Sequence, residues 1–400
     1  MSGTRLGNCK GNSGITFPAA KTVYWNPTTS NSWGVGACWN LTSFAGGNHA
    51  YFPLAQDTAV IPSTSLASGG TVTINAAYNI GTIDMSARTS NTMTLATGTT
   101  APVIYGNWIN GTGTTLSGSG QIMFSGRNTQ TITCAGKPFT HPIGIQTPSG
   151  SVTLQDAFIS SSTSSGAITV SSGTFNANGY NLTLTSGGIQ TATTSSKTIA
   201  VGSGTWVLGH SSAPWTVTST GLTVTGTGTI SLTAVSGKTF AGGSMSYSGI
   251  TLNQGGLGNL NITGNNTFAN ITSTYSTTAA TGIALANTTQ TFVNFTASGT
   301  VGKLLTITGT SATSPANIIY AGTSKPDLNY LNIVGIRAYS LNTTWYAGPN
   351  SVNNGSLGWY FTSVPIVGPS SVYYGSLNIS SIYYGSIPVS EIYYGSTKVF

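Results

Sequence analysis

Carboxylates are the side chains of this sequence best suited to catalysis, and they are few and scattered. The five are Asp57, Asp84, Asp156, Asp327 and Glu391. Enzymes that hydrolyse polysaccharides usually hold two carboxyl groups within about 5 to 9.5 Å of each other. Asp84 precedes Arg88 by four residues, and we expect these two side chains to form a local ion pair. The sequence therefore predicts no catalytic residue and a protein that is not an enzyme.

The side chains that commonly bind metals are equally isolated. Three histidines and three cysteines are spread along the chain: His49, His141, His210, Cys9, Cys38 and Cys134. None of them has the Cys-x-x-Cys spacing of a zinc site, and the odd number of cysteines excludes a framework made of disulfides. The Gly-x-Ser-x-Gly elbow and the glycine-rich phosphate loop are absent as well. We expect no metal and no cofactor.

The most specific pattern is a ten-residue repeat near the C-terminus. An aliphatic residue followed by Tyr-Tyr-Gly-Ser occurs at residues 372–376, 382–386 and 392–396. Tyrosine offers a flat apolar face with a polar tip, and repetition strengthens weak contacts through avidity. The repeats therefore predict a recognition or docking site for a glycan or a protein, with a clasp between subunits as the alternative. The residues of this predicted site are Tyr373, Tyr374, Tyr383, Tyr384, Tyr393 and Tyr394.

The elements that position these residues are predicted to be strands. Glycine makes up 53 of the 400 residues, charged residues are only 4%, and threonine and serine are abundant, which disfavours helices. Short segments such as Met93-Thr94-Leu95 and Leu182-Thr183-Leu184 alternate aliphatic and polar residues and recur about every 15 to 25 residues. This pattern favours an all-β fold, a right-handed parallel β-helix, over β-sandwich or jelly-roll domains.

Such a solenoid fixes approximate distances between the carboxylates. At roughly 22 residues per coil, about 300 residues form about a dozen coils and a rod of about 60 Å. Asp84 and Asp156 are then about three coils apart, roughly 15 Å, which is too far for a catalytic pair. Asp57 and Asp84 can occupy neighbouring coils, and carboxylates can also pair between subunits. A polysaccharide-cleaving enzyme therefore remains an alternative.

Three segments are expected along the chain. Residues 1–62 form an aromatic cap or docking segment, residues 63–362 form the β-solenoid shaft, and residues 363–400 carry the tyrosine repeats. The cap prediction depends on aromatic side chains that can cover the open edge of the first coil. These are Tyr24, Trp25, Trp33, Trp39, Phe44, Tyr51 and Phe52.

The charge of the chain limits its partners. The net charge of +7 comes from scattered lysines and arginines, so we expect no nucleic-acid binding. A surface with so few charges suits a protein that exists in an assembly, and we expect a multimer, with a homotrimer favoured. We also expect neither a secretion signal nor membrane insertion, because no stretch approaches the roughly 18 apolar residues of a membrane span.

Three stretches together resemble virion proteins of tailed bacteriophages that have β-helical shafts. The first runs from Val23-Tyr24-Trp25 to Asp57-Thr58-Ala59-Val60, although Asn26 and Cys38 stand where that family more often has glycine. The second runs from Asp327-Leu328-Asn329-Tyr330 to Gly358-Trp359-Tyr360-Phe361, and is similar to the closing coil of those shafts. The third is the Ile-Tyr-Tyr-Gly-Ser repeat. The resemblance therefore rests on both ends of the chain and leaves most of the shaft uncovered.

The resemblance implies a structural component of a bacteriophage virion, located in the particle beside other virion proteins. A tail or head fibre or appendage that helps attachment to the host surface is the leading hypothesis. A capsid decoration protein is the alternative within the particle. A tailspike that depolymerises polysaccharide and a bacterial surface adhesin are the alternatives of other classes.

Overall fold

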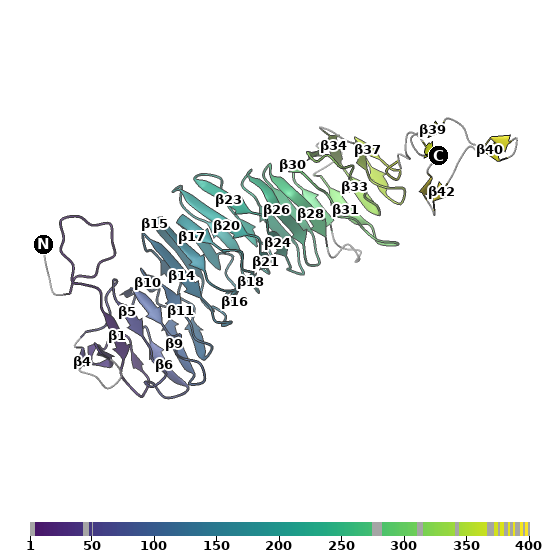
Figure 1. The fold of residues 1–400 in the computed structure, drawn as a ribbon. Coiled ribbons are helices and arrows are strands. Elements are labelled where there is room, and N and C mark those ends of the chain that lie inside the picture. The colour runs from purple at the N-terminus through teal and green to yellow at the C-terminus, as the bar shows by residue number, and fades with distance from the viewer. Residues whose placement is uncertain are drawn as a thin grey trace.

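The structure is a computed structural model, and it is an elongated rod of stacked β-strands (Figure 1). It describes residues 5–42, 48–49, 51–273, 282–309, 315–340 and 344–365, together with short strands between residues 372 and 398. Within this part, one 3-10 turn at Gly36–Cys38 interrupts an otherwise all-β chain. The strands pair in parallel from coil to coil over about 12 turns. The prediction of a parallel β-solenoid is thus confirmed, and the sandwich and jelly-roll alternative is wrong.

The shaft strands stack in three columns that run along the rod. Column one contains β1 (Thr22–Trp25), β5 (Thr58–Val60), β8 (Thr82–Asp84), β11 (Trp108–Ile109), β14 (Thr129–Thr133), β15 (Ile143–Leu154), β17 (Ile168–Asn176), β20 (Lys197–Gly202) and β23 (Leu222–Gly226). Column two contains β7 (Asn79–Ile80), β10 (Val103–Ile104), β13 (Ile122–Phe124), the first halves of β15 and β17, β19 (Ile189–Thr191), β22 (Trp215–Thr216), β25 (Lys238–Ala241), β27 (Leu260–Thr263), β29 (Gly282–Leu285), β31 (Leu305–Thr308), β33 (Leu331–Val334) and β36 (Val352–Asn354).

Column three has two parts, which belong to separate sheets. The first part contains β2 (Asn31–Ser32), β6 (Gly70–Thr73), β9 (Met93–Gly98) and β12 (Thr114–Gly118). The second part contains β16 (Phe158–Ser160), β18 (Leu182–Leu184), β21 (Thr205–Leu208), β24 (Thr229–Leu232), β26 (Ser246–Gln254), β28 (Thr267–Ser273), β30 (Thr289–Phe292), β32 (Ala316–Tyr320) and β34 (Ile336–Ser340). At the end of the shaft, β35 (Trp345–Tyr346) pairs in parallel with β37 (Trp359–Tyr360).

The coils vary in length around the predicted value. The chain uses fewer residues to pass from Ile104 to its strand partner Phe124 on the next coil than from Ile307 to its strand partner Ile333. The variation falls in the turns, because the strands must keep their register for aliphatic side chains to stack inside. In β9, for example, Met93 and Leu95 are buried and Thr94 is only half-buried. The alternation read from the sequence is therefore the alternation between the interior and the surface of the rod.

A continuous column of aromatic rings fills the C-terminal half of the interior. Ten rings follow one another with centroid separations between 5.0 and 6.4 Å: Phe175, Trp206, Trp215, Phe240, Tyr247, Phe268, Phe292, Phe295, Trp345 and Trp359. Offset and edge-to-face ring pairs stabilise a core beyond the area that they bury, by about 0.5 to 1.5 kcal/mol each. The rings thus couple each coil to the next along the interior.

Three tryptophans cluster near the N-terminal end of the rod. Trp39 lies edge-on to Trp25 and Trp33, with ring centroids 5.1 and 4.7 Å apart, and all three side chains are fully buried. Trp39 also donates a hydrogen bond from Nε1 to the Trp33 carbonyl at 2.8 Å. In the same segment, β3 (Trp39–Asn40) pairs antiparallel with β1 and with β4 (Asn48–His49). The segment predicted as a cap therefore supplies strands to the first coil and packs its tryptophans together, and its role as a cap stays a prediction.

The other aromatic residues of the predicted cap lie outside this cluster. Tyr51 is 49% exposed, and Phe52 packs against Tyr78 with ring centroids 5.0 Å apart. The guanidinium of Arg5 lies over both rings, 4.2 Å from the Tyr51 centroid and 4.8 Å from the Phe52 centroid. Phe44 lies outside the described residues. Of the aromatic residues of the predicted cap, the tryptophans are thus buried together, while Tyr51 is partly exposed and packs against Arg5.

Buried cations connect the turns of neighbouring coils. Arg88 donates from its guanidinium to the carbonyls of Pro62, Leu66 and Thr92 at 3.0, 2.9 and 3.0 Å. The predicted ion pair with Asp84 is wrong, because the Arg88 side chain points into the rod while the Asp84 carboxylate accepts hydrogen bonds from Ser86. Four-residue spacing brings side chains together on a helix, but here a turn separates the two residues.

Two lysines repeat this arrangement farther along the rod. Lys197 donates from Nζ to the carbonyls of Ser195 and Thr220 at 2.7 and 3.0 Å. Lys238 donates to three carbonyls, those of Ala234, Gly256 and Leu257, at 3.0, 3.0 and 2.7 Å. Burial lowers the pKa of Lys238 to about 8, so its ammonium is still protonated at neutral pH. Each lysine thus bridges carbonyls that belong to turns of two neighbouring coils.

A buried histidine lies where the two parts of column three meet. The coil between β12 and β16 contributes only an isolated bridge, between Phe139 and Ser160, to this column. His141 lies in this coil, with Nε2 2.7 Å from Thr97 Oγ1 and Nδ1 3.0 Å from Thr140 Oγ1. It is 1% exposed, and burial lowers its pKa from 6.5 to about 4. The junction therefore contains a neutral imidazole that resists protonation while the chain is folded.

We expect His141 to make the shaft acid-sensitive. As the pH falls below 6.5, the unfolded chain takes up a proton at His141, but the folded chain does not until about pH 4. The unfolded state binds more protons in this window, so the free energy of unfolding falls, by about 2 kcal/mol between about pH 7 and pH 5. Melting curves at the two pH values measure the loss, and His141→Gln should remove most of it. The matched variant His210→Gln should lose as much stability between the two pH values as the wild type. If His210→Gln removes the loss and His141→Gln does not, His141 is not the group that makes the shaft acid-sensitive.

Candidate functional site

The predicted tyrosine site lies on three short hairpins after the shaft. The strands β38 (Val372–Tyr374) and β39 (Leu377–Ile379) pair antiparallel, as do β40 (Tyr383–Tyr384) with β41 (Ile387–Pro388), and β42 (Tyr393–Tyr394) with β43 (Thr397–Lys398). In the first hairpin Tyr374 pairs with Leu377, so the Gly-Ser of the repeat separates the strands. A two-residue loop that begins with glycine is typical of hairpins. Each sequence repeat thus corresponds to one hairpin.

This pairing explains why an aliphatic residue recurs seven positions after the first one. Val372 and Ile379 are direct partners across the first hairpin. The hairpins belong to separate two-stranded sheets among the described strands. The side chains of the six predicted site residues lie outside the described part of the structure, and their role as a recognition site stays a prediction.

Two of the five carboxylates each accept hydrogen bonds from two backbone N–H groups of turns. Asp57 accepts hydrogen bonds from the N–H groups of Lys21 and Leu54 at 2.9 and 2.8 Å, and it is 4% exposed. Asp156 accepts from the N–H groups of Cys134 and Ala135, both at 2.7 Å. Short carboxylate side chains commonly cap turns by accepting from N–H groups in this way. These two aspartates therefore have a structural role in the turns of the rod.

The other carboxylates lie apart from these. Asp84 caps its own turn through the N–H and the hydroxyl of Ser86, at 2.9 and 2.6 Å. Its backbone pairs with Val60 on the preceding coil, so Asp57 and Asp84 do lie on neighbouring coils, as expected. Their side chains, however, bind different turns. Asp327 is exposed near the end of the shaft, and Glu391 lies outside the described residues.

The histidines and cysteines do not converge either. Among the described residues, no group of three histidine, cysteine or acidic residues is arranged to hold a metal. Cys9, Cys38 and Cys134 have free thiols. Cys134 is buried beside Asp156, and both burial and that carboxylate raise its pKa, so its thiol is protonated and unreactive. In the described part of the chain, these side chains thus do not gather into a group that could hold a metal.

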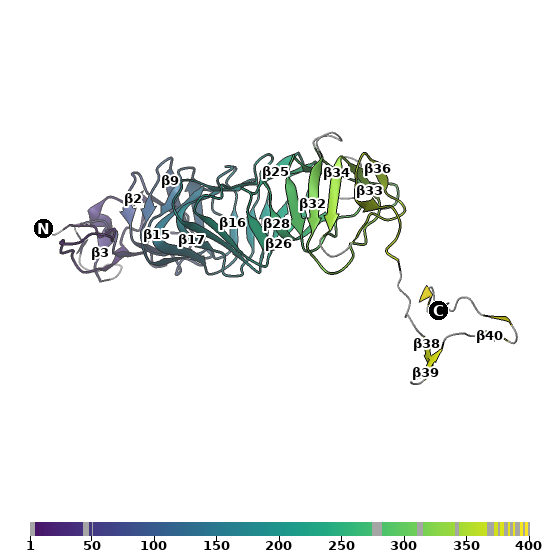
Figure 2. The same ribbon diagram turned by 90° about the horizontal axis from the view of Figure 1, so that it is seen from above.

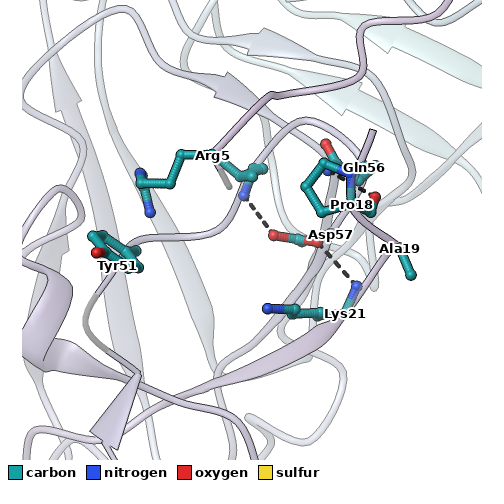
Figure 3. A pocket seen from close by; sticks show the side chains of 8 residues that line it. Arg5, Pro18, Ala19, Lys21, Tyr51, Gln56 and Asp57 are labelled. Carbon is teal, nitrogen blue, oxygen red and sulfur yellow. Dashed lines mark hydrogen bonds between the residues drawn. The ribbon is translucent and has the colours of Figure 1, made fainter. Parts of the chain in front are cut away.

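A pocket of about 230 Å³ lies at the N-terminal end of the rod (Figure 3). It is lined by the turn of Gln56 and Asp57 together with Arg5, Lys21 and Tyr51. Gln56 and Asp57 hold the N-terminal arm, residues 5–21, against the shaft. The Gln56 amide, for example, donates to the Leu6 carbonyl at 3.1 Å and accepts from the Asn8 N–H at 2.8 Å.

The chemistry of this pocket suits attachment of the arm. Both carboxylate oxygens of Asp57 are occupied by backbone N–H groups. The Arg5 guanidinium lies over Tyr51, a cation–π contact at the exposed edge. The pocket therefore fixes the arm to the first coils and leaves a basic and aromatic surface at this end of the rod. Reading the sequence had identified Asp57 and Tyr51 but not Gln56, whose role depends on a contact 48 residues away.

A second hollow, of about 390 Å³, lies on the outer face of column three near the other end of the shaft. It is lined by Thr289, Asn317, Ile319 and Tyr339 on the strands β30, β32 and β34. The strands β32 and β34 lie side by side in the green part of the rod in Figure 2, and β30 pairs with β32 on its other side. Tyr339 is 45% exposed, unlike the rings of the interior column. Tyr339 was not identified as a candidate site residue from the sequence. The segment Ile336-Arg337-Ala338-Tyr339 alternates apolar and larger polar or aromatic residues, and in a strand this alternation places the tyrosine on the outer face.

Comparison with family models, with curated proteins and with solved structures finds no match for this chain. Among the described residues, no helix is long and apolar enough to cross a membrane. The class that the fold defines is that of parallel β-solenoids.

Proposed function

We propose that this protein is a structural component of a bacteriophage virion, a tail or head fibre or appendage that contributes to attachment at the host surface. The observation that carries the proposal is a rod of about 12 coils whose chain continues into three tandem hairpins of one repeated sequence. A rod of this kind spaces its two ends about 60 Å apart. Repeated units at one end suit multivalent contact with a surface.

The internal construction of the rod supports a mechanical role. The interior is a continuous column of aliphatic and aromatic side chains, and buried cations connect the turns of successive coils. The outer face is made mainly of threonine, serine and asparagine, with side-chain hydrogen bonds from coil to coil such as Asn332 to Thr306 at 3.3 Å. With so few surface charges, the rod suits a homotrimer that docks onto other virion proteins.

We propose further that the chain has no catalytic activity. Backbone N–H groups of separate turns bind the carboxylates of Asp57, Asp84 and Asp156. This supports the proposal, because a glycosidase needs one protonated and one ionised carboxyl group on either side of the glycosidic bond that it cleaves. An assay for new reducing ends, with polysaccharide from the host surface and the full-length protein, tests it. Release of oligosaccharide would favour a tailspike enzyme.

Mass measurement in solution and labelling of purified particles test the proposed function. We expect a mass three times that of the chain and a label at the tail or on a head fibre. A label spread over the capsid surface would favour a decoration protein, and a label on the bacterial envelope would favour an adhesin. A stable monomer that is absent from particles contradicts the proposal.

A further inference from the structure

We propose that the hollow on β30, β32 and β34 binds an acidic polysaccharide, with Tyr339 stacked on a sugar ring and Arg337 paired with a carboxylate of the sugar. This site is separate from the tyrosine repeats, and the proposal deepens the proposed function by naming a ligand class for the shaft itself. It is called the distal hollow below and is lined by Thr289, Asn317, Ile319 and Tyr339. Arg337 lies beside it, as the strand partner of Asn317 and the hydrogen-bond donor to Tyr339.

The aromatic surface of the distal hollow is prearranged. Tyr339 lies on β34 and pairs with Ile319 on the preceding coil, and Ile319 pairs in turn with Thr291. The Tyr339 hydroxyl accepts a hydrogen bond from Arg337 Nη1 at 3.3 Å, which helps to orient the ring. An exposed tyrosine with an oriented ring loses little conformational entropy on binding, which suits stacking against the apolar face of a pyranose.

Polar groups with unused hydrogen-bonding capacity lie beside this ring. Thr289, Asn317 and Arg337 are direct partners on three successive coils, so they repeat at about 4.8 Å along the rod. Asn317 Nδ2 donates to Thr289 Oγ1 at 3.3 Å, which orients the amide. Within the described part of the chain, Asn317 Oδ1 makes no hydrogen bond. A row of amide, hydroxyl and guanidinium groups parallel to the axis suits a linear ligand rich in hydroxyls.

Charge selects an acidic sugar over a neutral one. Arg337 is exposed, and in the described residues it forms no ion pair, while its guanidinium has five N–H donors of which one meets Tyr339. The guanidinium fork matches a carboxylate bidentately. One arginine is too little for a nucleic-acid backbone, which requires several cations along its length. The net charge of +7 also attracts a polyanion at long range.

Binding of oligosaccharides to the full-length protein tests this proposal by calorimetry. The probes are an oligomer of uronic acids, a neutral glucose oligomer of the same length and a sulfated glucose oligomer. We expect the uronic acid oligomer to bind at least about tenfold more tightly than the neutral one, since a hydrogen bond to a charged group contributes about that factor. Equal or tighter binding of the sulfated oligomer would overturn the assignment to a carboxylate.

Two variants locate the site, and a third is the matched control. Tyr339→Ser and Arg337→Gln should each weaken binding of the uronic acid oligomer about tenfold, with unchanged melting temperature. Tyr180 is 39% exposed on a turn of a distant coil, and Tyr180→Ser should leave binding unchanged. Absence of binding, or binding that neither variant of the hollow alters, overturns the proposal. Because the probes test isolated protein, these outcomes are independent of where the protein lies in a particle.

Discussion

Replacing Tyr373, Tyr383 and Tyr393 together by serine is expected to reduce attachment to the host surface or to the particle by about a hundredfold. Each of these tyrosines lies in the paired segment of one hairpin, opposite Asn378, Pro388 and Lys398 respectively. A single tyrosine contact is weak, but linked contacts form at a high effective concentration and multiply their affinities by about 10² or more. Losing all three therefore costs much more than losing one.

Binding of purified wild-type and variant protein to cells and to particles lacking this protein measures the effect. Strand content and melting temperature should stay the same, because the aliphatic partners Val372 and Ile379 and the shaft are intact. Replacing the exposed Tyr360 of the last coil by serine is a matched control with no expected loss. If attachment is unchanged while the trimer dissociates, the repeats are a clasp between subunits, and their assignment as a recognition site is wrong.

The second large effect is expected from Lys238→Met, which should lower the free energy of unfolding by at least about 3 kcal/mol at neutral pH. Methionine has nearly the same length but leaves the carbonyls of Ala234, Gly256 and Leu257 without the ammonium that they now bind. Each buried acceptor that loses its partner costs about 1 to 3 kcal/mol. Relief of the buried charge offsets part of this cost, since burial already lowers the pKa of Lys238.

Unfolding in guanidinium chloride measures this loss, and Lys303→Met is the matched control because Lys303 is exposed. The control should change stability by less than about 0.5 kcal/mol. Hydrogen exchange should place the loosened amides in the coils around residues 234–257, because a solenoid couples mainly neighbouring coils. Equal stability of the two variants contradicts the assignment of Lys238 as a connection between coils.

The local pattern of the sequence was sufficient to predict the strands and their stacking. Alternation such as Met93-Thr94-Leu95 fixes which side chains face inward, and its recurrence at roughly one coil length allows parallel pairing at every step. The burial of the tryptophans near the N-terminus could be anticipated because large apolar side chains are most stable when they are covered, while their role as a cap stays a prediction. The hairpin of each repeat follows from Gly-Ser between paired segments.

The sites depended on contacts that local sequence does not encode. Asp84 and Arg88 are only four residues apart in sequence. The turn between them, however, leaves the Asp84 carboxylate on its own turn and directs the Arg88 guanidinium toward carbonyls of the preceding coil. The distal hollow brings together residues from positions 289 to 339, and no spacing rule joins them because the coils differ in length. By itself, then, the sequence determined a thin β-solenoid followed by a repeated segment. Only the tertiary structure decided which polar side chains bind the turns and which remain free on the surface, because that choice depends on the register between coils.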